Sequence, residues 1–136
     1  MNTSIFVNVP VKDLNKSMEF FKKLGWSFNP QFTDENAASM VVSDTIYVML
    51  LKEDYFKTFT KKQIVDAKIS TEALFALSFE SKTKVDELFH KAIEAGATEA
   101  RKTSDMGFMY TRSFDDLDGH TWELFWMDPK NVQPTE

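Results

Sequence analysis

The stretch Asp115-Asp116-Leu117-Asp118-Gly119-His120-Thr121-Trp122-Glu123-Leu124-Phe125-Trp126 predicts a tight turn followed by a strand. Its Asp118-Gly119 pair is a strong turn signal, because glycine accepts the positive φ angle that a turn between strands requires. In the strand that follows, successive side chains point to opposite faces. One face is wholly apolar and is expected to lie under a helix, and it comprises Trp122, Leu124 and Trp126.

Glu123 lies in the middle of this strand on the other face, between Thr121 and Phe125. A carboxylate there must be solvated, paired with a cation, or turned into a cavity that receives a ligand. If it is paired, Arg112 is the expected partner, because strands joined by a short turn are neighbours. Alternatively, Arg112 binds a substrate carboxylate. The sequence favours a cavity at Glu123, because the large side chains fill the opposite face.

Length, charge and composition exclude several classes of protein. The 136 residues fit one compact domain over 1–136. A net charge of −5 argues against nucleic-acid binding, which requires a clustered basic surface. The absence of cysteine excludes disulfides and thiolate metal sites. With no apolar run of transmembrane length and no basic leader, we expect a cytoplasmic protein that does not bind membranes.

The first half of the chain predicts one strand, one helix and three further strands. Residues 5–9 are β-branched and aromatic, as in a strand. Asp13 is the expected N-cap of a helix that Gly25 ends. Further strands are expected at about 26–32, 38–42 and 46–51.

The second half predicts the same order again. A strand at 73–79 precedes a helix that Thr83 and Asp86 cap and Gly96 ends, and strands follow at 97–100, 109–114 and 121–126. The chain is therefore a tandem repeat of two βαβββ modules, about 1–52 and 73–128. The polar connector at about 53–72 holds short helices and either packs on the sheet or covers a pocket. The expected fold is α+β, with curved, half-open barrel-like sheets enclosing a cleft and helices on the outer face.

Three motifs in this repeat resemble those of the vicinal oxygen chelate superfamily. They are Phe6-Val7-Asn8-Val9-Pro10-Val11-Lys12-Asp13-Leu14, the Phe20-Phe21 pair before Leu24-Gly25, and Asp116-Leu117-Asp118-Gly119-His120-Thr121-Trp122-Glu123. The superfamily includes glyoxalase I, extradiol dioxygenases, fosfomycin resistance enzymes and bleomycin-resistance proteins. Because one fold hosts many chemistries, the resemblance implies the fold more firmly than an activity. A half-open barrel is easily completed by a second copy, so a homodimer is expected.

The same resemblance bears on metal binding. Metal enzymes of the superfamily place ligands on the first and last strands of each module. Those positions fall on Phe6, Met49, Leu74 and Glu123, and only Glu123 is a ligand type. Asn8, two residues along the first strand, is a poor transition-metal ligand. Because a divalent ion needs several nitrogen or oxygen donors, we predict no bound metal and no cofactor.

The candidate pocket and its function follow from these positions. Glu123 is the candidate catalytic residue. The candidate ligand contacts are Phe6, Asn8, Tyr47, Met49, Leu74, Phe108, Tyr110 and Arg112. The alternatives are core packing for the apolar residues and a structural hydrogen bond for Asn8. The first function hypothesis is a metal-free pocket that binds a small, partly apolar molecule. The others are a glyoxalase-type lyase with Glu123 as base or metal ligand, and a partner-binding module with a filled cavity.

Overall fold

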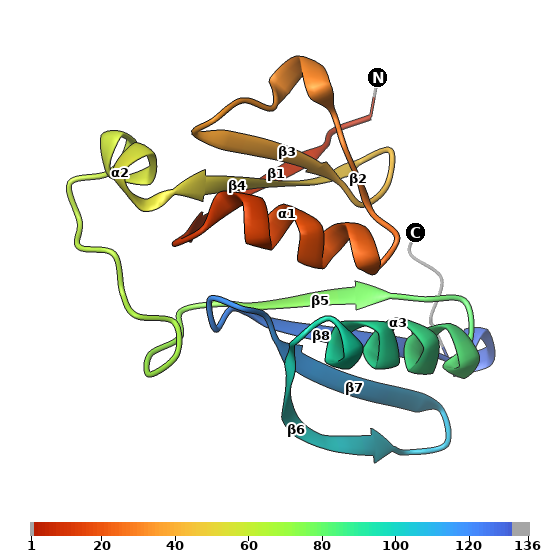
Figure 1. The fold of residues 1–136 in the computed structure, drawn as a ribbon. Helices are drawn as coiled ribbons and strands as arrows, with labels where there is room; N and C mark the ends of the chain where they lie inside the picture. The colour runs from red at the N-terminus through yellow and green to blue at the C-terminus, as the bar shows by residue number, and fades with distance from the viewer. Residues whose placement is uncertain (1, 132–136) are drawn as a thin grey trace. The chain divides into compact units, whose positions relative to one another are not determined.

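The computed structural model describes residues 2–131 and separates into two compact units, which divide between Val65 and Asp66 (Figure 1). Each unit contains one four-stranded mixed sheet and follows the order βαβββ. The predicted α+β fold of two repeated modules is thus confirmed, and neither sheet closes into a barrel. The cleft expected between the two sheets stays a prediction. Among the described residues, no helix has the length and apolar character needed to cross a membrane.

The first unit is built on a sheet whose strands run in the order β1-β4-β3-β2 (Figure 1). Strand β1 (Ile5–Val11) is parallel to β4 (Ile46–Lys52). The sheet continues antiparallel through β3 (Ala37–Val41) to β2 (Ser27–Phe28). Helix α1 (Leu14–Lys23) connects β1 to β2 and packs against β3 and β4.

Helix α1 begins and ends where its sequence predicts. The Asp13 carboxylate accepts a hydrogen bond from the backbone N–H of Lys16 at 3.1 Å, which satisfies one of the free donors of the first turn. Gly25 follows the last turn with a φ of 102°, a conformation that glycine adopts without strain. The apolar side of the helix and one face of the sheet form the core of this unit, which includes Val9, Val11, Phe20, Phe21, Met40 and Leu50.

The second strand is much shorter than predicted. A strand was expected over about 26–32, but β2 ends at Phe28 and a 3₁₀ helix occupies Pro30–Phe32. Proline has no N–H to donate to a sheet, so Pro30 cannot continue the ladder. The Asn29 side chain caps the 3₁₀ helix by accepting a hydrogen bond from the N–H of Gln31 at 3.0 Å. The connector holds the short helices that were expected, α2 (Glu53–Phe56) and a 3₁₀ helix at Lys57–Phe59.

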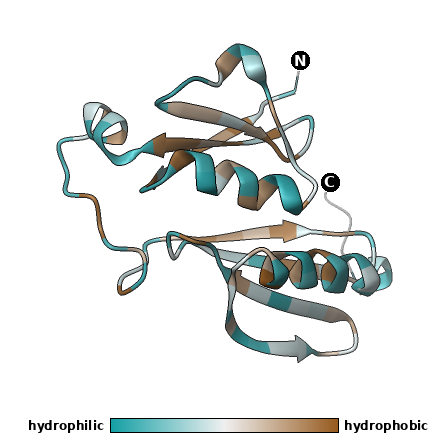
Figure 2. Cartoon of the chain, viewed as in Figure 1, coloured by the Kyte–Doolittle hydropathy of each residue, from teal (hydrophilic) through white to brown (hydrophobic). Residues whose placement is uncertain are grey.

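The second unit repeats the topology with strands in the order β5-β8-β7-β6. Strand β5 (Leu74–Ser78) is parallel to β8 (Thr121–Met127). The sheet continues antiparallel through β7 (Met109–Asp115) to β6 (Thr98–Asp105). Helix α3 (Lys82–Glu94) packs against β6, β7 and β8. Figure 2 shows hydrophobic residues along most of β5 and alternating hydrophilic and hydrophobic residues along α3.

The start of α3 differs from its prediction. The Ser81 hydroxyl, not that of Thr83, caps the helix by accepting a hydrogen bond from the N–H of Lys84 at 3.1 Å. Ser81 has the extended backbone that an N-cap requires, whereas Thr83 is already helical. The carboxylate of Asp86 is consequently free to reach across to the sheet, where it contacts Tyr110 and Arg112.

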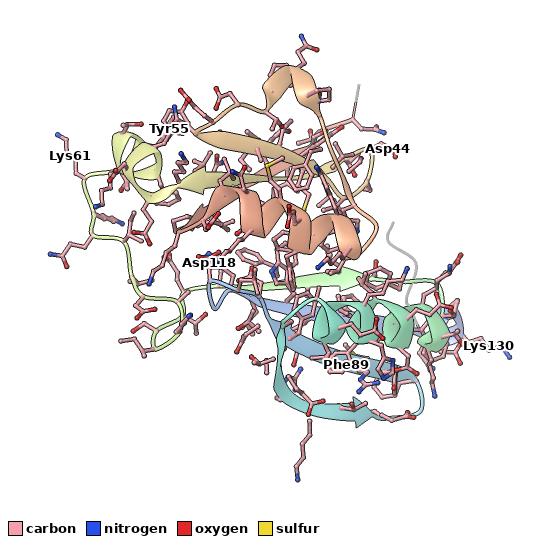
Figure 3. The ribbon with its side chains drawn as sticks, viewed as in Figure 1. Asp44, Tyr55, Lys61, Phe89, Asp118 and Lys130 are labelled. Carbon is pink, nitrogen blue, oxygen red and sulfur yellow. The ribbon has the colours of Figure 1, made fainter. Side chains whose placement is uncertain are left out.

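The turn before β8 is organised by the buried carboxylate of Asp116, which is 8% exposed. Its Oδ1 accepts hydrogen bonds from the backbone N–H groups of Asp118 and His120, each at 3.0 Å. Its Oδ2 accepts one from Trp122 Nε1, also at 3.0 Å. Burial raises the pKa of Asp116, while His120 and these N–H donors act in the opposite direction. The turn, in which Figure 3 labels Asp118, is thereby tied to the buried ring of Trp122.

Replacement of Asp116 should destabilise the protein strongly. Asp116→Ala leaves two backbone N–H groups and the Trp122 indole N–H without their acceptor, and we expect a loss of about 2–4 kcal/mol in the free energy of unfolding. Asp116→Asn should lose less, because its amide oxygen still accepts hydrogen bonds. Urea denaturation measures both. Asp34→Ala is the control, because the exposed Asp34 carboxylate also accepts two backbone N–H bonds. Equal losses for Asp116→Ala and Asp34→Ala would contradict the role of burial.

Candidate functional site

An open hollow of about 550 Å³ lies on the second sheet, on the face opposite α3. Its lining belongs entirely to the second unit and consists of Leu74, Ala100, Arg101, Ser113, Asp115, Thr121 and Glu123. Two of these residues, Leu74 and Glu123, are among the candidates that the sequence predicted. Glu123 therefore lines an open hollow, as the cavity hypothesis for this residue requires.

Three polar residues form a row across this face. Arg101 on β6 lies opposite Ser113 on β7, and Ser113 lies opposite Glu123 on β8. Residues that are directly opposite on neighbouring strands share a face of the sheet, so all three side chains meet at the hollow. The other face carries Trp122 and Leu124, which are 1% and 0% exposed and belong to the core under α3.

Glu123 forms an ion pair with Arg101. The Arg101 Nη2 atom lies 2.9 Å from Glu123 Oε1, and Nε donates a hydrogen bond to the same oxygen at 3.1 Å. The Glu123 side chain is 18% exposed and that of Arg101 is 56% exposed. Because the Arg101 side chain is more than half exposed, the pair contributes little to stability, and its main effect is to hold both side chains at the hollow.

A β-bulge brings Arg101 to this face. Glu99 lies opposite Phe114 and Arg101 lies opposite Ser113, so β6 advances by two residues while β7 advances by one. The extra residue reverses the alternation of β6, and Arg101 leaves the face that Glu99 occupies. Sequence reasoning missed this residue, because the strand was expected to end at Ala100 and nothing in the sequence marks the bulge. Ala100, Ser113, Asp115 and Thr121 were missed as well.

Ser113 lies beneath the ion pair. It is 1% exposed, and its Oγ has no hydrogen-bond partner within the described part of the chain. Arg101 and Glu123 contact each other from the strands on either side of Ser113, which accounts for its burial. Beside this row on the same face, the Thr121 hydroxyl donates a hydrogen bond to Asp115 Oδ1.

The alternative in which Glu123 pairs with Arg112 is wrong. Arg112 lies opposite Leu124, and so its side chain is on the face that packs against α3. There its Nη1 donates a hydrogen bond to Asp86 Oδ1 at 3.1 Å, and its Nη2 lies 4.0 Å from Glu99 Oε2. Its guanidinium carbon is 3.9 Å from the ring centroid of Phe89, which Figure 3 labels on α3.

Tyr110 lies on the same helix-facing side as Arg112, so the structure does not place either residue in the hollow with Glu123. The Tyr110 hydroxyl donates a hydrogen bond to Asp86 Oδ1 at 2.6 Å. Burial raises the pKa of Asp86, but Tyr110 and Arg112 together outweigh it and hold that pKa below its usual value. Phe108 lies in the turn between β6 and β7, 41% exposed, and does not line the hollow.

The remaining candidates share one face of the first sheet. Phe6 lies opposite Tyr47 and Asn8 lies opposite Met49. The rings of Phe6 and Tyr47 stack with centroids 4.6 Å apart. Asn8 Nδ2 donates a hydrogen bond to the carbonyl of Phe6 at 3.1 Å, which is the structural role weighed for it. Core packing does not describe Phe6, which is 55% exposed. Ligand contacts for these four residues stay predictions.

The residues at the family's metal positions do not fit a metal ion. On β5, the residue opposite Glu123 is Ala76, and the family position two residues before it is Leu74. Neither side chain can bind a cation, and the Glu123 carboxylate already has a guanidinium beside it. Among residues 2–131, no group of three or more histidine, cysteine, aspartate or glutamate side chains is arranged to hold a metal.

Comparisons with known proteins agree with the fold. A family model described as bleomycin resistance protein-like N-terminal matches residues 3–43. A hypothetical protein from S. aureus has a solved structure with a TM-score of 0.77 and 27% identity, over 93% of this chain and 95% of that one. No curated protein matches the sequence.

Two further solved structures show the fold at lower identity. A glyoxalase/bleomycin resistance protein/dioxygenase family enzyme from Burkholderia phytofirmans has a TM-score of 0.74 and 15% identity, over 90% of this chain and 96% of that one. A genomically encoded fosfomycin resistance protein from Listeria monocytogenes has a TM-score of 0.70 and 16% identity, over 96% and 97%. The resemblance predicted from the sequence motifs is confirmed.

The ion pairing of Glu123 can be tested with double-mutant cycles on the free energy of unfolding. For Arg101→Gln and Glu123→Gln we expect a coupling of about 0.5–1 kcal/mol, because Arg101 is largely exposed. Arg112→Gln and Glu123→Gln should show no coupling, because these side chains lie on opposite faces of the sheet. A strong coupling between Arg112 and Glu123, with none between Arg101 and Glu123, would refute the register described here.

Proposed function

Since the chain carries the fold of the vicinal oxygen chelate superfamily, we propose that it binds a small, partly apolar molecule without a metal ion. The binding site is the hollow on the second sheet. Glu123 and Arg101 provide its polar anchor, and Leu74 and Ala100 provide apolar surface. A volume of about 550 Å³ lies within the usual range of small-molecule pockets.

The observation that carries this proposal is the guanidinium of Arg101 beside Glu123. Glu123 is the single family ligand position that retains a ligand type, and Arg101 Nη2 lies 2.9 Å from its Oε1. A divalent ion there would be repelled by the guanidinium and would find no second or third donor on β5. In this site an arginine, rather than a metal ion, neutralises the Glu123 carboxylate.

Small-molecule binding can be tested by a fragment screen on ¹⁵N-labelled, chelator-treated protein, followed by NMR. We expect a set of fragments that perturb the backbone amides of the hollow, including Arg101, Ser113 and Glu123. Glu123→Gln should weaken the binding of those fragments to the hollow. Glu99→Gln is the matched control, because Glu99 is on the opposite face of the same sheet. A screen whose fragments all bind elsewhere, or bind the hollow only after metal is added, would refute the proposal.

The proposal that the protein binds no metal ion can be tested directly. We expect elemental analysis of purified protein to find no stoichiometric zinc, nickel, iron or manganese, because Phe6, Met49 and Leu74 offer no ligands at their positions. About one tightly held ion per chain would contradict this, as would a metal that restores fragment binding after chelation.

We also propose that the protein is a homodimer. Strands β1 and β5 are the edges of their sheets, and large apolar side chains there are exposed: Ile5 is 57%, Phe6 55% and Leu74 55% exposed. Apolar edges of this kind are usually covered, because free edges promote non-specific association. Light scattering at micromolar concentration should give twice the chain mass of 15.7 kDa. A monomer mass under those conditions would contradict the dimer.

A further inference from the structure

We propose that the hollow recognises a neutral amide-type group, in which a hydrogen-bond acceptor and an N–H donor are adjacent, through Ser113, Arg101 and Glu123. This inference rests on the proposed function, because it names the chemical class of the ligand for the same site. It goes beyond it by excluding carboxylate and ammonium groups as the preferred polar part of the ligand.

The first observation is the buried hydroxyl of Ser113. Its Oγ is without a hydrogen-bond partner among residues 2–131, although Ser113 is only 1% exposed and lines the hollow. A buried hydroxyl that makes no hydrogen bond destabilises a protein, because it loses its bonds to water on folding and gains none. Native structures retain few such groups. A group of this kind at the wall of a pocket is explained most simply by a ligand atom that forms the missing hydrogen bond.

The second observation is the arrangement of the ion pair around this hydroxyl. Both contacts that Arg101 makes with Glu123 end on Oε1. Within the described residues, Oε2 of Glu123 therefore retains its capacity to accept, and Nη1 of Arg101 its capacity to donate. With Ser113 between them in register, the row offers an acceptor, a hydroxyl and a donor on one face.

Charge decides which ligand group matches this row. Arg101 and Glu123 neutralise each other, so a neutral group leaves the charge of the site balanced when the exposed Arg101 side chain turns aside and admits it to Ser113. A carboxylate would compete with Glu123 for the guanidinium and would also meet Asp115, a second carboxylate in the lining. An ammonium would compete with Arg101 for Glu123. A carboxamide has a carbonyl oxygen for Ser113 or Arg101 and N–H donors for Glu123.

A matched series of probes tests this assignment. Benzamide, benzoate and benzylamine share one ring and differ in the charge of the attached group at neutral pH. Each is titrated into ¹⁵N-labelled protein with chelator present, and affinities are taken from the shifts of the amides that line the hollow. We expect benzamide to bind most tightly and to perturb Arg101, Ser113 and Glu123.

Variants separate ligand binding from a structural role. Ser113→Ala should lower the affinity for benzamide by roughly five- to tenfold, which corresponds to the loss of about one hydrogen bond. The same variant should be as stable as the wild type or more stable, because it removes a buried hydroxyl that has no partner. Ser39→Ala, at a serine that is 3% exposed on the first sheet, is the control and should leave benzamide affinity unchanged.

The outcomes distinguish this inference from the proposed function. If benzoate or benzylamine binds the hollow more tightly than benzamide, the amide assignment fails and small-molecule binding stands. The assignment also fails if Ser113→Ala leaves benzamide affinity unchanged. If the three probes miss the hollow while other fragments bind there, again only the assignment fails. If neither the probes nor the fragment screen perturbs the hollow, the proposed function fails with it.

Discussion

The candidate site depends on which side chains of strand β8 point to each face of the sheet, and the buried carboxylate of Asp116 fixes this alternation. Asp116 accepts hydrogen bonds from the backbone of the turn and from the Trp122 indole. It therefore fixes where the turn ends and which face receives Trp122. Because side chains alternate along a strand, placing Trp122 in the core commits Glu123 to the opposite face. A shift of one residue would bury the carboxylate and expose the tryptophan, so stability of the core and position of the site are set together.

The second determinant of the site is the irregularity of β6. Without the extra residue at Ala100, Arg101 would share a face with Glu99, where Arg112 is already placed between Glu99 and Asp86. The bulge instead directs the two arginines of the chain to opposite faces. One stabilises the packing of α3 on the sheet, and the other meets Glu123 at the hollow. The same residue type thus has a structural role on one face and a candidate binding role on the other.

The fold could be predicted well from the sequence because short local signals specify where its elements begin and end. Asp13, Gly25 and Gly119 mark ends and turns through their own backbone and capping preferences, and each acts as predicted. The site was only partly predictable. Glu123 follows from strand alternation and Leu74 from the superfamily resemblance, but Arg101 depends on a bulge with no sequence mark. The alternative pairing of Arg112 with Glu123 fails for a related reason: proximity along a hairpin predicts neighbouring strands, whereas the register alone decides which residues share a face.

The central claim is that a guanidinium, and not a metal ion, neutralises Glu123 in a site that binds small molecules. Its most direct test is a crystal structure of the protein grown with added zinc, with anomalous data collected at the zinc absorption edge. The account predicts no anomalous peak at the Glu123 carboxylate and an Arg101 guanidinium at hydrogen-bond distance from it. A zinc peak about 2.0–2.2 Å from a Glu123 oxygen, with Arg101 displaced, would contradict it.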